Sequence, residues 1–127
     1  MGGRLRLFCA SDLQMPAALA AGFDGLSSTN SCALPELIHE SFHAFKAGDA
    51  RRGTMLYRIW YDYRTAARSF GQPQSVKAAM RLRGWVGGHV RAPLLDLTAE
   101  QVETLKAVFM PLLAADRGRH QPVDRAA

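Results

Sequence analysis

Only the first thirty residues of this chain carry patterns typical of β-strands. The segment RLRLFCA, residues 4–10, begins with alternating charged and apolar residues and then becomes continuously apolar, as expected for a short buried strand. A helical pattern over 13–21 and a second short strand candidate, FDGLSS at 23–28, follow it. The order strand, helix, strand predicts a parallel βαβ unit.

This predicted sheet is too small to stand alone. Two short parallel strands do not form a stable sheet, because their outer edges stay unpaired. The rest of the sequence indicates helices and loops, with helices expected over 34–47, 50–70, 75–83 and from Thr98 to about residue 116. We therefore expect the closing part of a larger α/β structure, rather than a chain that hides two more strands.

The expected helices begin and end at residues that favour helix boundaries. Ser11 or Asp12 can cap the first helix, and Gly22 is a natural residue to end it. The helix over 50–70 is expected to be the longest and to end at Gly71. Its apolar stripe consists of Met55, Leu56, Ile59, Tyr63, Ala66 and Phe70.

The last helix has the clearest start signal in the sequence. Thr98 and Gln101 have the spacing of a capping box. Leucines 105 and 112, Val102 and either Val108 or Phe109 are expected to face inward. Glycines, a proline and weak periodicity predict a loop over 84–97 before this helix.

Charge and hydropathy exclude several classes of function. The net charge is +5, but the arginines are dispersed along the chain, so we expect no nucleic-acid partner. No apolar run approaches the roughly 18 residues of a membrane span, so we expect no membrane association. The start lacks the apolar region of a secretory signal, which favours a cytoplasmic protein with Cys9 and Cys32 as free, buried thiols.

Four motifs, in this order and at these intervals, carry a family resemblance. They are LFCASD (7–12), AAGFDGLSS (20–28), PELIHESFHAFKAGDARRG (35–53) and QPQSVKAAMRLRGWVGGHVRAPLLDLT (72–98). From Leu5 to Phe109 the chain resembles the C-terminal part of the dihydrodipicolinate synthase / N-acetylneuraminate lyase family. That family consists of class I, Schiff-base-forming, pyruvate-dependent lyases. The resemblance implies an α/β fold, the C-terminal portion of a (β/α)8 TIM barrel followed by helices.

The resemblance also implies a domain organisation and a site. Residues 1–32 are expected to form the last two βα units of the barrel, 33–116 the C-terminal helices and 117–127 a frayed tail. Ligands bind at the carboxyl ends of barrel strands. The implied substrate-binding residues are Ala10, Ser11 and Asp12 after the seventh strand, and Ser27, Ser28 and Thr29 after the eighth.

Three departures from the family pattern leave the substrate open. Ala10 stands where the family usually has glycine, and Cys32 stands where an asparagine is common. Asp12 is followed by Leu13 instead of a second acidic residue, which weakens a sialic-acid assignment. Aldolase, dehydratase and hydratase-aldolase branches all stay compatible with the sequence.

The resemblance places the catalytic groups outside these residues. In the family the Schiff-base lysine ends the sixth strand and the relay tyrosine ends the fifth, both before Leu5. Lysines 46, 77 and 106 lie on expected helices, and tyrosines 57, 61 and 63 lie on a packing helix. We therefore expect no catalytic residue here, no cofactor and no activity alone. The intact enzyme is expected to bind a 2-keto acid and to form a homo-oligomer, a tetramer in relatives.

A second class of function stays open on the sequence alone. The chain can instead be a non-catalytic truncated relic or a small helical interaction module. His39 and His43 have the spacing of metal ligands but no evident third ligand, so we assign them to a helix surface or a packing role. Arg91 is expected to be structural, and Trp60 and Trp85 to lie in a core or an interface. Uncovered strand edges predict marginal stability and association of the isolated chain.

Overall fold

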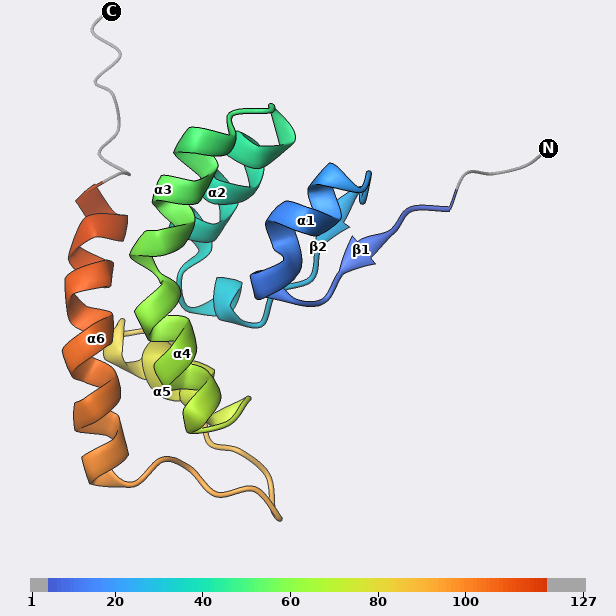
Figure 1. The fold of residues 1–127 in the computed structure, drawn as a ribbon. Coiled ribbons are helices and arrows are strands. Elements are labelled where there is room, and N and C mark those ends of the chain that lie inside the picture. The colour runs from blue at the N-terminus through green and yellow to red at the C-terminus, as the bar shows by residue number, and fades with distance from the viewer. Residues whose placement is uncertain (1–4, 119–127) are drawn as a thin grey trace, which may run out of the picture.

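The computed structural model describes residues 5–118. Short strands and α1 lie at one end of the molecule, and helices α2 to α6 gather at the other (Figure 1). In chain order the elements are β1 (Phe8–Cys9), the 3-10 helix η1 (Asp12–Gln14), α1 (Met15–Ala20), β2 (Gly25–Leu26), the 3-10 helix η2 (Asn30–Cys32), α2 (Pro35–Lys46), α3 (Ala50–Ile59), α4 (Tyr61–Ser69), α5 (Gln74–Leu82) and α6 (Ala99–Gly118).

The two strands pair in parallel, as the strand, helix, strand order predicts. Phe8 lies opposite Gly25 and Cys9 opposite Leu26, and within residues 5–118 these strands are the whole sheet. Each strand is shorter than the expected 4–10 and 23–28 (Arg4 lies outside the described residues). The physical reason is that each strand has a hydrogen-bonding neighbour on one side only, so few residues satisfy a ladder.

Helices α2 and α3 pack closely against each other. Asp49 caps α3 by accepting a hydrogen bond from the Arg52 amide at 2.9 Å. A Cβ atom at Gly53 would lie 2.8 Å from the ring of Phe45, so glycine permits the close approach of the two helices. The Ser41 hydroxyl donates to the Gly53 carbonyl at 3.2 Å across the same contact.

The prediction of a single helix over 50–70 is wrong. The helix is interrupted at Trp60, whose φ and ψ of −98° and 6° lie outside the helical range, so α3 and α4 are separate. The longest helix is α6, with 20 residues. Met55 is also not on the buried stripe: it is 57% exposed, because α3 turns Gly53 and Leu56 inward instead.

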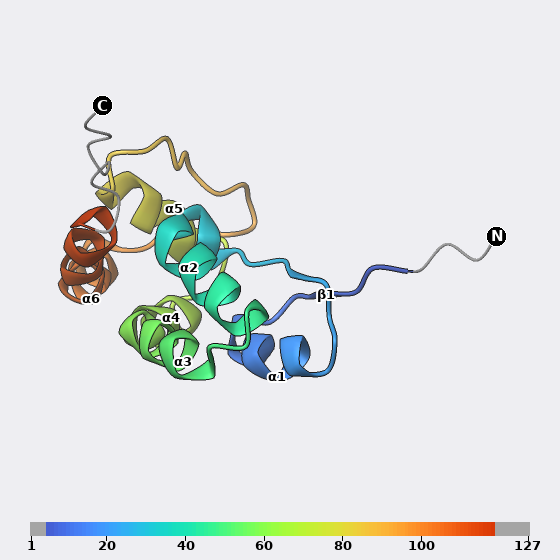
Figure 2. The same cartoon turned by 90° about the horizontal axis from the view of Figure 1, so that it is seen from above.

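A hydrophobic core lies between α2, α4, α5 and α6. Figure 2 shows α6 beside α4 and α5. Trp60 is fully buried, as expected, and the rings of Tyr63 on α4 and Phe109 on α6 lie 5.2 Å apart. The capping box at Thr98 and Gln101 is confirmed, with backbone-to-side-chain distances of 2.9 and 3.3 Å. The frayed tail was expected over 117–127, but α6 continues to Gly118, so residues 117 and 118 are helical; residues 119–127 lie outside the described residues.

Arg83 links the helices to the segment that follows β2. Its guanidinium donates to the Ala33 carbonyl at 3.0 Å and pairs with Glu36 at 2.7 Å. It also lies 4.0 Å from the ring of Trp85, which is 41% exposed and so not in the core. These contacts tie α5 to α2 and to the end of the strand region.

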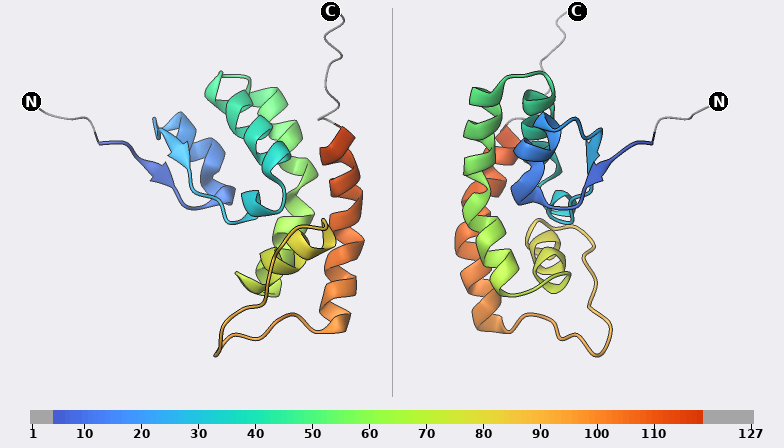
Figure 3. Two further views of the ribbon diagram at one scale, coloured as in Figure 1. Left: turned by 180° about the vertical axis from the view of Figure 1, so that it is seen from behind. Right: turned by 45° about the vertical axis from the view of Figure 1, so that its right-hand side comes forward.

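The segment over 84–97 is a loop, as expected, and it extends away from the helices (Figure 3). Lys77 donates to the Gly87 carbonyl at 2.8 Å, and Arg81 donates to the Gly88 carbonyl. The ring of His89 contacts the carboxylate of Asp96 within the loop. Side chains of α5 therefore hold one end of this loop by its backbone.

Other expectations for single residues have mixed outcomes. The Ser11 side chain forms no capping hydrogen bond with the described residues. Both cysteines are free, but only Cys9 is buried and Cys32 is exposed. The Arg91 carbonyl accepts from the Leu94 amide at 3.1 Å, but its side chain forms no hydrogen bond with residues 5–118, so the structural contact expected of that side chain is wrong within that range.

Candidate functional site

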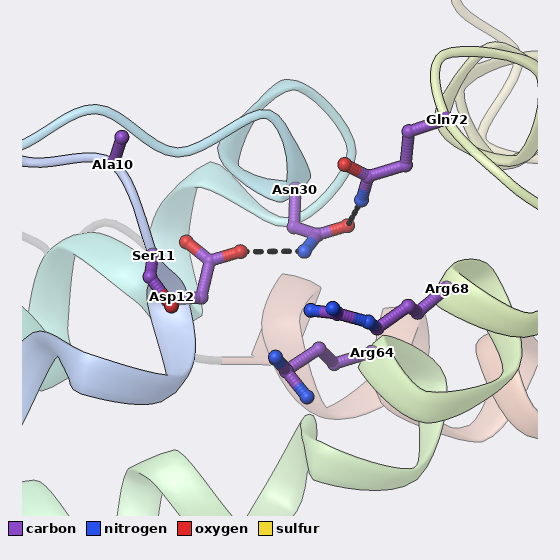
Figure 4. A pocket seen from close by; sticks show the side chains of 7 residues that line it. All are labelled: Ala10, Ser11, Asp12, Asn30, Arg64, Arg68 and Gln72. Atoms are coloured by element: carbon purple, nitrogen blue, oxygen red, sulfur yellow. Dashed lines mark hydrogen bonds between the residues drawn. The ribbon is translucent and has the colours of Figure 1, made fainter.

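A polar cavity lies at the carboxyl ends of the two strands. Ala10, Ser11 and Asp12 follow β1 directly, and Asn30 begins η2 after β2. The cavity measures about 260 Å³ and is completed by Arg64, Arg68 and Gln72 (Figure 4). Parallel strands end at the same edge of a sheet, which is why residues from two separate loops meet here.

Three side chains from different segments form a hydrogen-bonded chain along one wall. The Asn30 amide donates to Asp12 Oδ2 at 2.6 Å, and the Gln72 amide donates to Asn30 Oδ1 at 3.2 Å. Asp12 is 9% exposed and Asn30 is buried. The second carboxylate oxygen of Asp12, Oδ1, is buried and has no hydrogen-bond partner in the described part of the chain. This wall therefore fixes a carboxylate in place and leaves one acceptor unused.

Two arginines on α4 form the opposite wall. Arg64 and Arg68 are one helical turn apart, and both guanidinium groups point toward the Asp12–Asn30 pair (Figure 4). Arg64 is 9% exposed as a residue; its backbone amide donates to the Trp60 carbonyl at 3.0 Å, and its guanidinium forms no hydrogen bond or ion pair with residues 5–118. The cavity therefore combines two positively charged side chains with an unused carboxylate acceptor.

Two tyrosines near this cavity, Tyr57 and Tyr63, have a raised hydroxyl pKa. Burial raises the pKa of Tyr63 well above its usual range, and the negative charge of Asp12 raises it further. Burial also raises the pKa of Tyr57, although the nearby charge of Arg64 acts in the opposite direction. The Tyr57 hydroxyl donates to the Leu13 carbonyl at 3.5 Å. Neither tyrosine lines the cavity.

The six residues expected from the resemblance do not all meet at this cavity. Ala10, Ser11 and Asp12 line it, whereas Ser27 and Thr29 do not. Ser28 lines a separate, more apolar cavity of about 440 Å³ together with Phe8, Asp24, Gly25, Leu26, Ser31, Pro35, Ile38, His39, Phe42 and His43. The Ser28 hydroxyl accepts from the Ser31 amide at 3.1 Å, which holds the turn before α2.

Four residues of the polar cavity were missed by sequence reasoning. Asn30 lies one residue beyond the Ser-Ser-Thr run, and Gln72 lies in the turn before α5. Arg64 and Arg68 have i, i+4 spacing on a polar helix. That spacing was the available signal, but it does not distinguish a solvent-facing pair from one that faces a cavity.

The lysines and histidines lie elsewhere. Lys46 donates to the Asp24 carbonyl, Lys77 to the Gly87 carbonyl, and Lys106 lies 3.5 Å from Glu103. The rings of His39 and His43 lie 4.3 Å apart, and residues 5–118 hold no group of three His, Cys, Asp or Glu side chains suited to a metal ion. In the same range, no helix is long and apolar enough to cross a membrane.

Comparison with known proteins assigns the family. The family model described as "Dihydrodipicolinate synthetase family" matches residues 1–111. The chain belongs to the dihydrodipicolinate synthetase family. This result confirms the resemblance seen in the four sequence motifs.

Curated members of the dihydrodipicolinate synthetase family are similar over most of this chain. A protein of Allorhizobium ampelinum named "Probable 5-dehydro-4-deoxyglucarate dehydratase" is 33% identical over 105 residues, which cover 80% of this chain and 35% of that protein. The 4-hydroxy-tetrahydrodipicolinate synthase of Symbiobacterium thermophilum is 34% identical over 104 residues, which cover 82% and 36%. The chain thus spans about a third of the length of these relatives.

A solved structure supports the same fold assignment. A variant of the 2-keto-3-deoxygluconate aldolase of Sulfolobus solfataricus superposes with a TM-score of 0.77 at 20% identity. The match covers 88% of this chain and 39% of the aldolase chain. The βαβ unit and the helices described above therefore have the arrangement found in part of a larger enzyme of this fold.

Proposed function

We propose that this chain is the C-terminal portion of a Schiff-base-forming lyase that acts on pyruvate or a related 2-keto acid. The family assignment and the position of the polar cavity at the carboxyl ends of β1 and β2 support this function. In this proposal the chain supplies walls of the substrate pocket, and the two strands are the last two of a barrel.

The positions of the lysines carry the proposal that the chain is inactive alone. Class I chemistry needs an unprotonated lysine amine that attacks the keto carbon. Lys46, Lys77 and Lys106 are the lysines of the sequence, and each donates to a carbonyl or lies beside a carboxylate away from the cavity. The relay tyrosine has no candidate at the cavity either, because Tyr57, Tyr61 and Tyr63 do not line it. A different segment of polypeptide must bring both groups.

The residues that follow the strands then have binding roles. Ala10 and Ser11 present main-chain groups to a small keto acid, and Asp12 presents a fixed carboxylate. Ser27, Ser28 and Thr29 shape the turn after the second strand and complete the pocket together with the rest of the barrel. Under the same proposal, the intact enzyme needs no metal or cofactor and works as a homo-oligomer.

Exposed apolar residues in and before β1 support the proposal that a further strand pairs with it in the intact enzyme. Leu5 is 85% exposed, and Leu7 and Phe8 are more than half exposed. An apolar strand edge of this kind pairs with another strand or associates. We propose that this edge pairs with the preceding strands of the barrel.

Borohydride trapping tests the function directly. The 127-residue chain is incubated with pyruvate and sodium borohydride, and its mass is measured by mass spectrometry. No covalent pyruvate adduct is expected. The DNA upstream of the Met1 codon is read for in-frame codons of six preceding βα units. A longer polypeptide that includes these units is the matched sample, and it is expected to gain one reduced pyruvate on a lysine before Leu5. A stable adduct on Lys46, Lys77 or Lys106, or no adduct on the longer polypeptide, contradicts the proposal.

A further inference from the structure

A pair of histidines on α2 has no part in the polar cavity. His39 and His43 are one helical turn apart, and both line the apolar cavity of about 440 Å³ beside β2. Their ring centres lie 4.3 Å apart, and the ring planes are tilted by 55°. Both residues are exposed, and neither imidazole forms a hydrogen bond or an ion pair with residues 5–118. Each neutral ring therefore keeps an acceptor nitrogen for a ligand from outside the chain.

The separation of the rings suits one metal ion shared by both. A bond from zinc to an imidazole nitrogen is about 2.0–2.1 Å long, which places the centres of two rings on one ion about 5 Å apart. The observed 4.3 Å is close to this value, and exposed side chains rotate readily enough to make up the difference. The Phe42 ring meets His43 edge-on with centres 5.3 Å apart, which restricts the rotation of one imidazole.

The charge of the cavity favours a cation. Asp24 is the charged residue among those that line it, and its carboxylate is held by the Leu7 amide at 2.9 Å. Lys46 donates to the Asp24 carbonyl at 2.9 Å but does not line the cavity. With both imidazoles neutral, the lining side chains thus carry one net negative charge, which attracts a positive ion.

We propose that His39 and His43 together bind one divalent transition-metal ion of the kind that prefers imidazole nitrogen, such as Zn²⁺. Residues 5–118 hold no group of three side chains suited to a metal ion, so water completes the coordination of this two-ligand site. Imidazole suits Zn²⁺, Ni²⁺ and Cu²⁺, whereas Mg²⁺ and Ca²⁺ prefer oxygen ligands. The site goes beyond the proposed function and takes no part in it, because the ion links two residues of α2 outside the polar cavity.

A zinc titration of the 127-residue chain tests the site residue by residue. The chain has four histidines, and the imidazole nitrogens of each give separate NMR signals. The titrated chain contains Cys32→Ser, because an exposed thiol is a competing zinc ligand. Zn²⁺ at micromolar concentration is expected to shift the signals of His39 and His43 together, with one ion bound per chain. Mg²⁺ at millimolar concentration is expected to shift neither.

Variants separate the pair from single histidines. His39→Ala and His43→Ala are each expected to weaken zinc binding by about tenfold or more, because one imidazole alone then holds the ion. His89→Ala removes an imidazole from the loop and is the matched control, with no change in affinity expected. Zn²⁺ is also expected to raise the urea midpoint of the parent chain but not of the two α2 variants, since the shared ion favours the folded helix. The exposed positions of His39 and His43 leave the core intact, and the amide spectrum of each variant checks this.

The outcomes separate the metal site from the lyase proposal. Equal shifts of all four histidines, equal zinc affinities of the parent and the His43→Ala variant, or equal responses to Zn²⁺ and Mg²⁺ overturn the metal site. Loss of binding in His89→Ala but not in His39→Ala also overturns it, because the ion then lies in the loop. If the longer polypeptide is trapped with pyruvate but zinc fails these tests, only the metal site is wrong. If zinc binds as expected but trapping fails, only the lyase proposal is wrong.

Discussion

Residues 35–118 enclose a core with fully buried Trp60 and Phe109, whereas strand β1 leaves Phe8 59% exposed in the same chain. The difference follows from how each element satisfies its backbone. Helices α2 to α6 form their hydrogen bonds internally and need only cover one apolar face each. Strands need neighbours for their backbone groups, and β1 has only β2. The described helices therefore cover their apolar faces, whereas β1 leaves one edge without a neighbouring strand.

The largest expected effect is on the helical side. Phe109→Ala removes a fully buried ring that contacts Tyr63, so it is expected to lower the free energy of unfolding by about 3–5 kcal/mol. Urea unfolding followed by circular dichroism at 222 nm measures this loss. Met110→Ala, at a 41% exposed neighbour on the same helix, is the matched control and is expected to lose far less. Equal losses would mean that the helices do not share one core.

The junction between the two sides is expected to give the next largest effect. Arg83→Ala breaks a pair with Glu36 in which the arginine side chain is buried, and it leaves the Ala33 carbonyl without its donor. Loss of one partner of a buried ion pair is expected to cost about 3 kcal/mol. Arg52→Ala breaks the exposed pair with Glu40 and serves as the comparison, with little change expected. The same urea titration distinguishes them.

On the strand side, the large apolar residue Phe8 is expected to contribute almost nothing to the stability of the isolated chain. Phe8→Ser should change the free energy of unfolding by less than about 0.5 kcal/mol, because the ring is mostly exposed. The same substitution should reduce self-association, since it removes apolar surface from the strand edge. Sedimentation velocity at several concentrations measures this. A loss comparable to that of Phe109→Ala would show that the strand side is already covered.

The smallest effect is expected in the loop between the helices α5 and α6. The hydrogen bond from the His89 ring, followed by that from the Val90 amide, lowers the pKa of Asp96. Its stabilising contribution is therefore present above the ordinary carboxyl pKa of about 3.9 and is lost as the pH falls through the lowered value. An NMR titration of the Asp96 side chain measures the shift. Asp96→Asn removes it and is expected to leave the helical core intact.

The sequence predicted helices better than strands, for reasons visible at particular residues. Thr98 and Gln101 act locally, within four residues, so the capping box was predictable. The extents of the strands were not, because they depend on partners that a strand pattern does not contain. The interruption at Trp60 was also missed, since a fully buried indole that fits the core overrides a continuous helical pattern.

The candidate site was predictable only where the chain itself carries the signal. Ala10, Ser11 and Asp12 follow a strand directly, and a site at strand ends is expected from the fold. Arg64 and Gln72 reach the same cavity from segments more than fifty residues away in sequence, through packing of α4 and the turn before α5. A local sequence pattern does not indicate which distant segments of the chain pack against it. The roles of Ser27, Ser28 and Thr29 stay predictions.

The interruption at Trp60 sets the rotation of α4 about its own axis. Each residue of an α-helix advances by about 100°, so insertion or deletion of one residue there turns Arg64 and Arg68 away from the cavity and brings other side chains to it. A change in helical phase at this single position therefore exchanges the α4 side chains that line the cavity and leaves the strand-end residues in place.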